Sequence, residues 1–209
     1  MMTSGKGRNR AGWRTACAAL AMLMMPVAAQ AQFSDSFNFL KAVKDKDGTK
    51  ATELMSKTNN AIVDTRDRET GRTALHYCVD LRDTTWLGFL LGKGARPDIA
   101  DNDGNTPLML AAQLRFVDGA RYLLSFKAQV DKPNRRGETP LIRAVQLNDV
   151  PMVNLLIENG ANPDKRDTLA GMSARDYAAR DIRSDAMTTA LNKAKPAGSK
   201  KEVQGPSLN

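Results

Sequence analysis

A nine-residue pattern that returns every 33 or 34 residues constrains this 209-residue chain more than any other feature. Proline is tolerated at the first helical position, because its missing N–H would have no partner there. The Thr-Pro pairs at Thr106-Pro107 and Thr139-Pro140 therefore each predict the start of a helix with threonine as its N-cap. The four copies are GRTALHYCV from Gly71, GNTPLMLAA from Gly104, GETPLIRAV from Gly137 and GMSARDYAA from Gly171.

A second marker keeps the same register between these copies. GARPD begins at Gly94 and GANPD at Gly160, and KAQVD begins at Lys127 in the equivalent place. A leucine pair, or Leu-Ile, precedes each marker. This predicts a second helix in every unit, ended by glycine in the left-handed conformation. One such unit cannot cover its own apolar face, so the units must stack.

The pattern resembles the ankyrin repeat, whose units read G-x-T-P-L-H-x-A-A, then a leucine pair, then G-A-D-x-N/D. The resemblance runs from about Phe37 to Leu191. It implies an all-α solenoid of stacked helix pairs joined by short β-hairpin connections. The expected organisation is a capping helix pair at 32–66, ankyrin repeats at 67–99, 100–132 and 133–166, and a C-terminal capping repeat at 167–192.

The two ends have a different composition. The first 31 residues hold four basic side chains, no acid, an apolar run from Thr15 to Ala29, and then Ala29-Gln30-Ala31. This is the layout of a secretory signal peptide cleaved after Ala31. The apolar run is shorter than the roughly 20 residues of a spanning helix, although an uncleaved anchor is the alternative. We expect a bacterial periplasmic protein, or a secreted one, with a disordered basic tail at 193–209.

The basic character belongs to these ends. The whole chain carries a formal charge of +8, and removing residues 1–31 leaves +4. The tail contributes +3, so residues 32–192 hold 23 basic and 22 acidic side chains, a net +1. A nucleic-acid surface requires a basic stripe on the folded part. The sequence therefore disfavours nucleic acid as the partner.

Little catalytic chemistry stands out. His76 is the only histidine, and the ankyrin resemblance implies that it bonds Thr73 and the backbone of the neighbouring hairpin. Cys78 is the one cysteine after residue 31, at a small-residue position of the repeat. One His and one Cys exclude a zinc site of nitrogen and sulfur ligands within the chain. We expect no enzyme, metal or cofactor; the alternative is a small redox or stress-related enzyme or sensor that uses Cys78.

Because little catalytic chemistry stands out, we expect the function to lie in binding at the protein surface. Ankyrin arrays bind partners along the concave face, so we expect a monomeric protein-binding scaffold or accessory factor for another protein. A row of leucines ten residues after the first three glycines is either an exposed ridge or folded onto the interhelical turn. The loops Asp67–Gly71 and Asp167–Gly171 are one residue longer than the other two. The candidate binding residues are Arg72, Asp80, Leu81, Asn105, Gln113, Leu114, Glu138, Gln146 and Leu147. The structural motif residues are Thr73, His76, Thr106, Pro107, Thr139, Pro140, Gly94 and Gly160.

Overall fold

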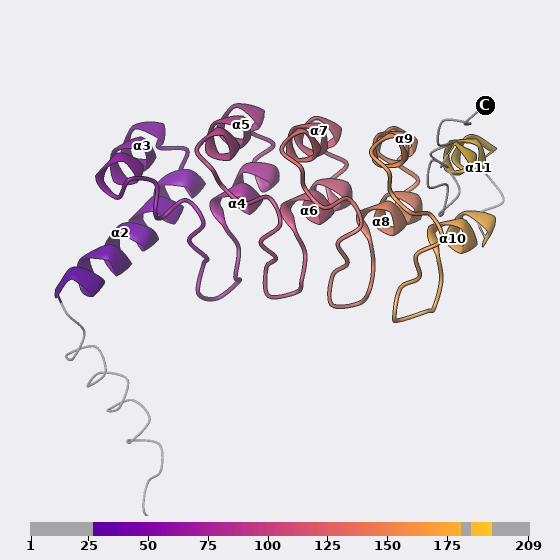
Figure 1. Ribbon diagram of the computed structural model, residues 1–209, viewed down its shortest axis with the longest axis horizontal. Coiled ribbons are helices and arrows are strands. Elements are labelled where there is room, and N and C mark those ends of the chain that lie inside the picture. The colour runs from indigo at the N-terminus through magenta and orange to yellow at the C-terminus, as the bar shows by residue number, and fades with distance from the viewer. Residues whose placement is uncertain (1–26, 181–184, 194–209) are drawn as a thin grey trace, which may run out of the picture.

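The computed structural model describes residues 27–180 and 185–193, and this part of the chain is a row of five stacked helix pairs (Figure 1). The predicted all-α repeat fold is confirmed. Residues 1–26 of the predicted signal peptide and residues 194–209 of the predicted tail lie outside the described residues. The pairs are α2 (Val27–Lys44) with α3 (Gly48–Lys57), α4 (Ala74–Asp80) with α5 (Thr84–Gly92), α6 (Pro107–Gln113) with α7 (Val117–Ser125), α8 (Pro140–Gln146) with α9 (Val150–Glu158), and α10 (Ala174–Arg180) with α11 (Asp185–Asn192).

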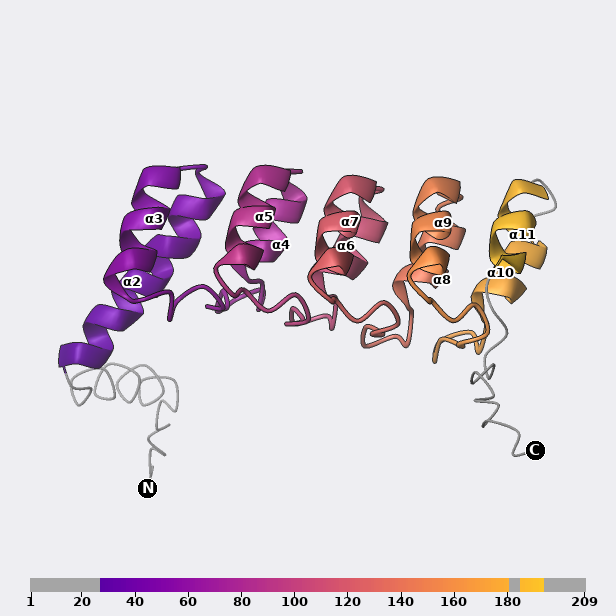
Figure 2. The same ribbon diagram turned by 45° about the horizontal axis from the view of Figure 1, so that its top comes forward.

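Each predicted segment from 32–66 to 167–192 holds one of these pairs, although α2 begins at Val27 and includes the predicted cleavage bond after Ala31. The first helices form one layer and the second helices the other, with finger-like loops projecting from the side of the first helices (Figure 1, Figure 2). None of the described helices is long and apolar enough to cross a membrane.

The helix starts follow the Thr-Pro prediction. Thr106 Oγ1 accepts a hydrogen bond from the backbone N–H of Met109, and Thr139 Oγ1 accepts one from Ile142, both at 3.2 Å. Pro107 is the first residue of its helix. These side-chain bonds satisfy N–H groups that have no partner within the helix.

The helix ends also follow the prediction. The φ angles of Gly94 and Gly160 are +91° and +86°, and Lys127, in the equivalent position, has a φ of +65°. All three residues thus reverse the chain with left-handed backbone, the conformation that glycine adopts without a steric penalty.

The core runs through the whole stack, because each first helix packs on the first helix of the next repeat and, from α5 to α11, each second helix packs on the next second helix. Small side chains permit this close approach: Ala111, Ala112 and Ala144 are fully buried between helices. The repeats therefore share one continuous apolar interior, as expected for units that cannot be covered singly.

The fingers between repeats differ from the β-hairpins that we expected. Within residues 27–180 and 185–193 no strand forms, and one isolated antiparallel bridge joins Arg166 to Ser173. The reason is local. An aspartate or asparagine at the start of each finger accepts the loop amides that a strand ladder would use: Asp101 Oδ1, for example, accepts from the N–H groups of Asp103 (2.9 Å) and Asn105 (2.8 Å). Such side-chain bonds compete with regular pairing.

Neighbouring fingers are bonded to each other through their backbones. The N–H of Asn102 donates to the carbonyl of Thr70, that of Arg135 to Asp103, and that of Thr168 to Arg136, at distances of 2.9–3.1 Å. The fingers thus form one connected sheet-like edge along the stack rather than four independent loops.

Candidate protein-binding face

His76 connects two repeats. Its Nδ1 accepts a hydrogen bond from the N–H of Thr73 at 3.1 Å and lies 3.0 Å from the Thr73 hydroxyl. Because Nδ1 is an acceptor, Nε2 carries the proton and donates to the carbonyl of Asn105, 3.0 Å away in the next finger. Burial is the main cause that lowers the pKa of His76, so the ring is neutral. These are the partners that the ankyrin resemblance implied for this residue.

Polar candidate residues of the first two repeats pair with each other on the expected concave face, called the inner face from here on. Arg72, at the base of the first finger, forms a 2.7 Å ion pair with Asp80 at the end of α4. One repeat along, Gln113 Nε2 lies 3.4 Å from Asn105 Oδ1, the same two positions of the unit. The finger bases and the first-helix ends are therefore neighbours in these two repeats.

Glu138 departs from this arrangement. It is 6% exposed, and its carboxylate accepts from Asn134 Nδ2 at 2.9 Å and pairs with Arg136 at 3.3 Å. Gln146 is exposed and binds Arg143 on its own helix instead. In the third repeat, Gln146 thus offers exposed polar surface, whereas the carboxylate of Glu138 binds groups of its own finger.

The leucine row lies at the junction of the two helix layers. Leu81, Leu114 and Leu147 are the C-cap residues of α4, α6 and α8, and each is half-buried. Arg82 donates to the carbonyl of Leu114, and Arg115 donates to that of Leu147. The row is therefore held in register by arginines from the preceding repeat, and it is intermediate between the exposed ridge and the buried arrangement.

Sequence analysis did not identify two tyrosines that hydrogen-bond to aspartates of the longer fingers. The hydroxyl of Tyr77 donates to Asp67 Oδ2 at 2.8 Å, and that of Tyr177 donates to Asp167 Oδ2 at 2.6 Å. Each pair closes one of the two longer fingers against the first helix of its own repeat. The hydrogen bond to Asp167 is the main cause that raises the pKa of Tyr177. The signal was present in the sequence as an Asp-to-Tyr spacing of ten residues that occurs only beside the longer loops.

A cleft of about 340 Å³ lies between α2 and the first finger. Lys44 at the end of α2 donates to Asp67 Oδ2 at 2.8 Å, and its Nζ is 4.4 Å from the centre of the Tyr77 ring. The bond from Lys44 is the main cause that holds the pKa of Asp67 well below its usual range. The capping helix is in this way joined to the inner face of the first full repeat.

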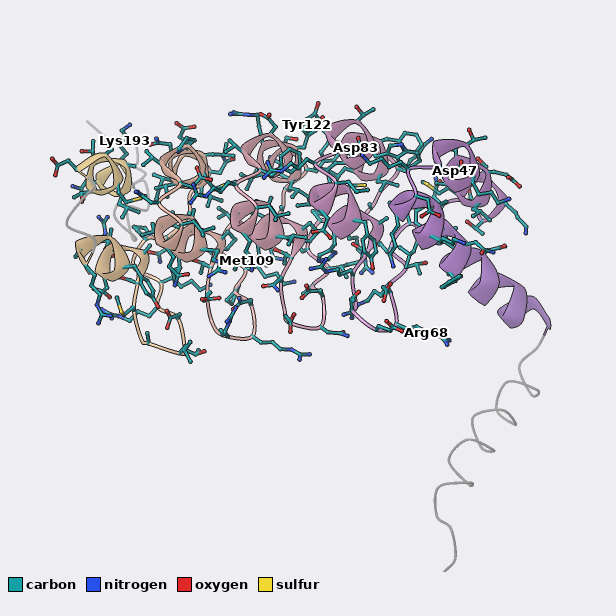
Figure 3. All side chains as sticks on the ribbon, turned by 180° about the vertical axis from the view of Figure 1, so that it is seen from behind. Asp47, Arg68, Asp83, Met109, Tyr122 and Lys193 are labelled. Carbon is teal, nitrogen blue, oxygen red and sulfur yellow. The ribbon has the colours of Figure 1, made fainter. Side chains whose placement is uncertain are left out.

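The second-helix layer carries aromatic side chains that the repeat pattern did not reveal. Phe89 on α5, and Tyr122 and Phe126 at the end of α7, are each more than a third exposed. Tyr122 projects from the second-helix side of the stack, away from the fingers (Figure 3). This outer patch provides a second surface against which the inner face can be compared.

Cys78 lies in the core at 1% exposure, and burial raises the pKa of its thiol to about 12. A reactive cysteine needs the opposite environment, electropositive and accessible. In the described residues no group of three or more His, Cys, Asp or Glu side chains is arranged to hold a metal ion.

Comparison with known families agrees with this architecture. Residues 82–167 match the family model described as Ankyrin repeats (3 copies). A search among curated proteins found no match to the chain. Residues 82–167 thus resemble ankyrin repeats and lie within an all-α repeat fold, and such repeats imply a protein-interaction scaffold.

Proposed function

We propose that this protein is an exported, periplasmic scaffold or accessory factor that binds another protein on its inner face and performs no catalysis of its own. The observation that carries the binding surface is the repetition of one partly exposed leucine in the same place of three successive repeats. Apolar surface in such a row tends to mark a binding site. Beside it, Arg72, Asp80 and Gln113 provide polar groups for a rim.

The alternative function, a redox or stress-related enzyme or sensor using Cys78, has less support. The buried thiol is almost entirely protonated at neutral pH, because its pKa is raised to about 12. Thiol labelling of the folded protein distinguishes the two functions: the scaffold proposal expects Cys78 to stay unmodified until the protein unfolds.

Export is supported by the sequence of the first 31 residues. The proposal expects the mature protein in the native host to begin at Gln32 and to be released with the periplasmic fraction. Amino-terminal sequencing of the purified protein tests this. Recovery of the chain from the cytosol with Met1 intact would refute the localisation and leave the binding proposal standing.

Binding is tested by replacing Leu81, Leu114 and Leu147 together with serine. Because these side chains are half-buried, we expect each change to cost less than the roughly 2–5 kcal/mol of truncating a fully buried leucine. A thermal melt confirms that the variant is folded. Pull-down from a periplasmic extract, followed by mass spectrometry, should then show the loss of a partner that the unchanged protein retains.

The outer aromatic patch supplies the matched control, Phe89, Tyr122 and Phe126 replaced together with serine. The proposal expects this variant to retain the partner. If the outer variant loses the partner and the inner one keeps it, the binding face is on the second helices and the inner-face assignment is wrong.

A further inference from the structure

The cleft beside the capping helix combines an exposed aromatic ring with an excess of positive charge. Phe37 on α2 is 66% exposed, and it lines the cleft together with Leu40. The N-terminal part of α2 extends beyond the layer of first helices, on the side of the stack from which the fingers project (Figure 1). The cleft is therefore walled by α2 on one side and by residues 65–69 on the other. Its volume of about 340 Å³ is near the lower end for ligand clefts.

The charges of the lining are unequal. Two acids line the cleft, Asp67 and Glu69, against four basic side chains, Lys41, Lys44, Arg66 and Arg68. The Asp67 carboxylate is occupied, since it accepts from Lys44, from the Tyr77 hydroxyl and from the N–H groups of Glu69 and Thr70. Apart from this Lys44 pair, the lining includes Lys41 and Arg66, which face a single acid, Glu69.

Arg66 is fixed in place by hydrogen bonds to backbone carbonyls. Arg66 Nε donates to the carbonyl of Gly71 at 3.1 Å, and its Nη2 donates to the carbonyl of Ala100 at 2.9 Å. Carbonyl partners orient the guanidinium without neutralising it. In the described residues, no carboxylate lies within ion-pair distance of Arg66 or Lys41. A preorganised cation loses little conformational freedom when it binds an anion.

We infer that this cleft binds an acidic segment of the protein partner, with a large apolar side chain on Phe37 and carboxylates against Lys41 and Arg66. The inference rests on the proposed protein-binding function and adds the chemistry of the bound segment. Lys44 and Tyr77 connect the cleft to the first helix of the inner face. A partner lying along the inner face therefore ends its contact here, where opposite charge favours its acidic part.

The test uses the purified chain and a fluorescein-labelled peptide in which one phenylalanine is flanked by glutamates. A second peptide has lysines in place of the glutamates. Fluorescence anisotropy should show saturable binding of the glutamate peptide, weakened by salt, and none of the lysine peptide. Lys41→Glu and Phe37→Ser should each weaken binding about tenfold, the change expected from one good contact. Both sites are exposed, and thermal melts confirm the fold.

Two further variants sharpen the result. Arg121→Glu makes the same change of charge on the exposed surface of α7, in the other helix layer, and should leave the affinity unchanged. Glu69→Gln removes the one acid left at the opening and should strengthen binding. Equal weakening by Lys41→Glu and Arg121→Glu would show a general charge effect and overturn the inference.

Other outcomes separate this inference from the scaffold function. Vesicles containing phosphatidylglycerol that bind where the glutamate peptide does not would assign the cleft to a membrane surface and overturn the inference. If the peptide fails to bind while the leucine variant still loses a captured partner, the scaffold function stands and the acidic segment is refuted. If the peptide binds as expected but no partner is lost from the leucine variant, the cleft is supported and the inner-face proposal fails.

Discussion

Helix α7 begins differently from α5 and α9, and this difference offers a sharp test of the packing. Asp83 caps α5 and Asp149 caps α9, each through a side-chain bond to the backbone N–H three residues on. Phe116 occupies the same place in α7 and provides no such bond. Its ring is instead 7% exposed and lies under the guanidinium of Arg82, whose Cζ is 5.6 Å from the ring centre.

Gly119, three residues later, fits the presence of Phe116 in place of a capping aspartate. A Cβ atom added to Gly119 would lie 2.3 Å from two atoms of the Phe116 ring. A buried ring cannot withdraw freely, so alanine at 119 is overpacked, which costs about 1–3 kcal/mol. The same alanine gains about 1 kcal/mol over glycine in a helix interior. We therefore expect Gly119→Ala to be neutral or to destabilise the protein by up to about 2 kcal/mol.

Replacing Phe116 should reverse the sign of the stability change caused by Gly119→Ala. Phe116→Asp restores an N-cap, worth about 1 kcal/mol, and loses the buried ring, for which truncation costs roughly 3–5 kcal/mol. The single variant is thus less stable by about 2–4 kcal/mol. In its background Gly119→Ala meets no ring and should stabilise by about 1 kcal/mol. The two changes are then coupled by about 1–3 kcal/mol.

Urea unfolding of the four proteins, monitored by circular dichroism, measures this coupling. Gly88→Ala is the control, because its Cβ would lie 3.3 Å from the edge of the exposed Tyr122 ring, which is free to move. Its effect should be the same with Phe or Asp at position 116. Additive effects of the Gly119 and Phe116 changes would refute the argument that the glycine exists to accommodate the ring.

Three further predictions concern single contacts. Burial lowers the pKa of His76 from 6.5, so the stabilisation from its neutral ring is complete above pH 6.5 and is lost as the pH falls toward the lower pKa of the folded state. The urea midpoint should therefore drop more between pH 7 and 5 in the unchanged protein than in His76→Gln. Parallel pH profiles of the two proteins would contradict this. Lys127→Gly relieves left-handed strain of about 1 kcal/mol and should be neutral or stabilising, whereas Gly160→Lys should raise the sensitivity to urea. Tyr77→Phe and Tyr177→Phe should each destabilise by about 1–3 kcal/mol, since each leaves a carboxylate short of a partner, and amide hydrogen exchange should accelerate in the finger concerned only.

Local chemistry made much of the stack readable from the sequence. Thr106 before Pro107 marks a helix start by rules that need no tertiary context, and the φ of Lys127 follows from its alignment with two glycines. The 33-residue period then indicates the stacking, because equal spacing places equivalent positions of successive repeats side by side in one column along the stack. The register of the leucine row was predictable in the same way.

The features that the sequence could not reveal depend on contacts between non-equivalent positions of neighbouring repeats. The carbonyl of Leu114 accepts a hydrogen bond from Arg82 of the preceding repeat, and no spacing in the sequence predicts this contact. The cleft was missed because α2 departs from the repeat pattern and its position relative to the first finger is a tertiary property. The exposed aromatic side chains of α5 and α7 vary between repeats, so periodicity carries no information about them.

The glycines that open each unit show how the stack itself explains the pattern. Gly104, Gly137 and Gly171 have φ angles of +83°, +73° and +64°, so alanine at any of them bears left-handed strain of about 1 kcal/mol. A Cβ on Gly104 would also lie 2.7 Å from the backbone nitrogen of Arg135, and one on Gly137 would lie 2.5 Å from that of Thr168. A Cβ on Gly171 would meet nothing within 4 Å. Gly104 and Gly137 thus make room for the finger that follows, whereas at Gly171 only the backbone conformation favours glycine. We therefore expect Gly171→Ala to destabilise far less than Gly137→Ala, whose cost includes displacing a neighbouring backbone. Equal urea midpoints for the two variants would show that backbone conformation alone requires glycine there, and that the fingers adjust to one another more freely than their hydrogen bonds indicate.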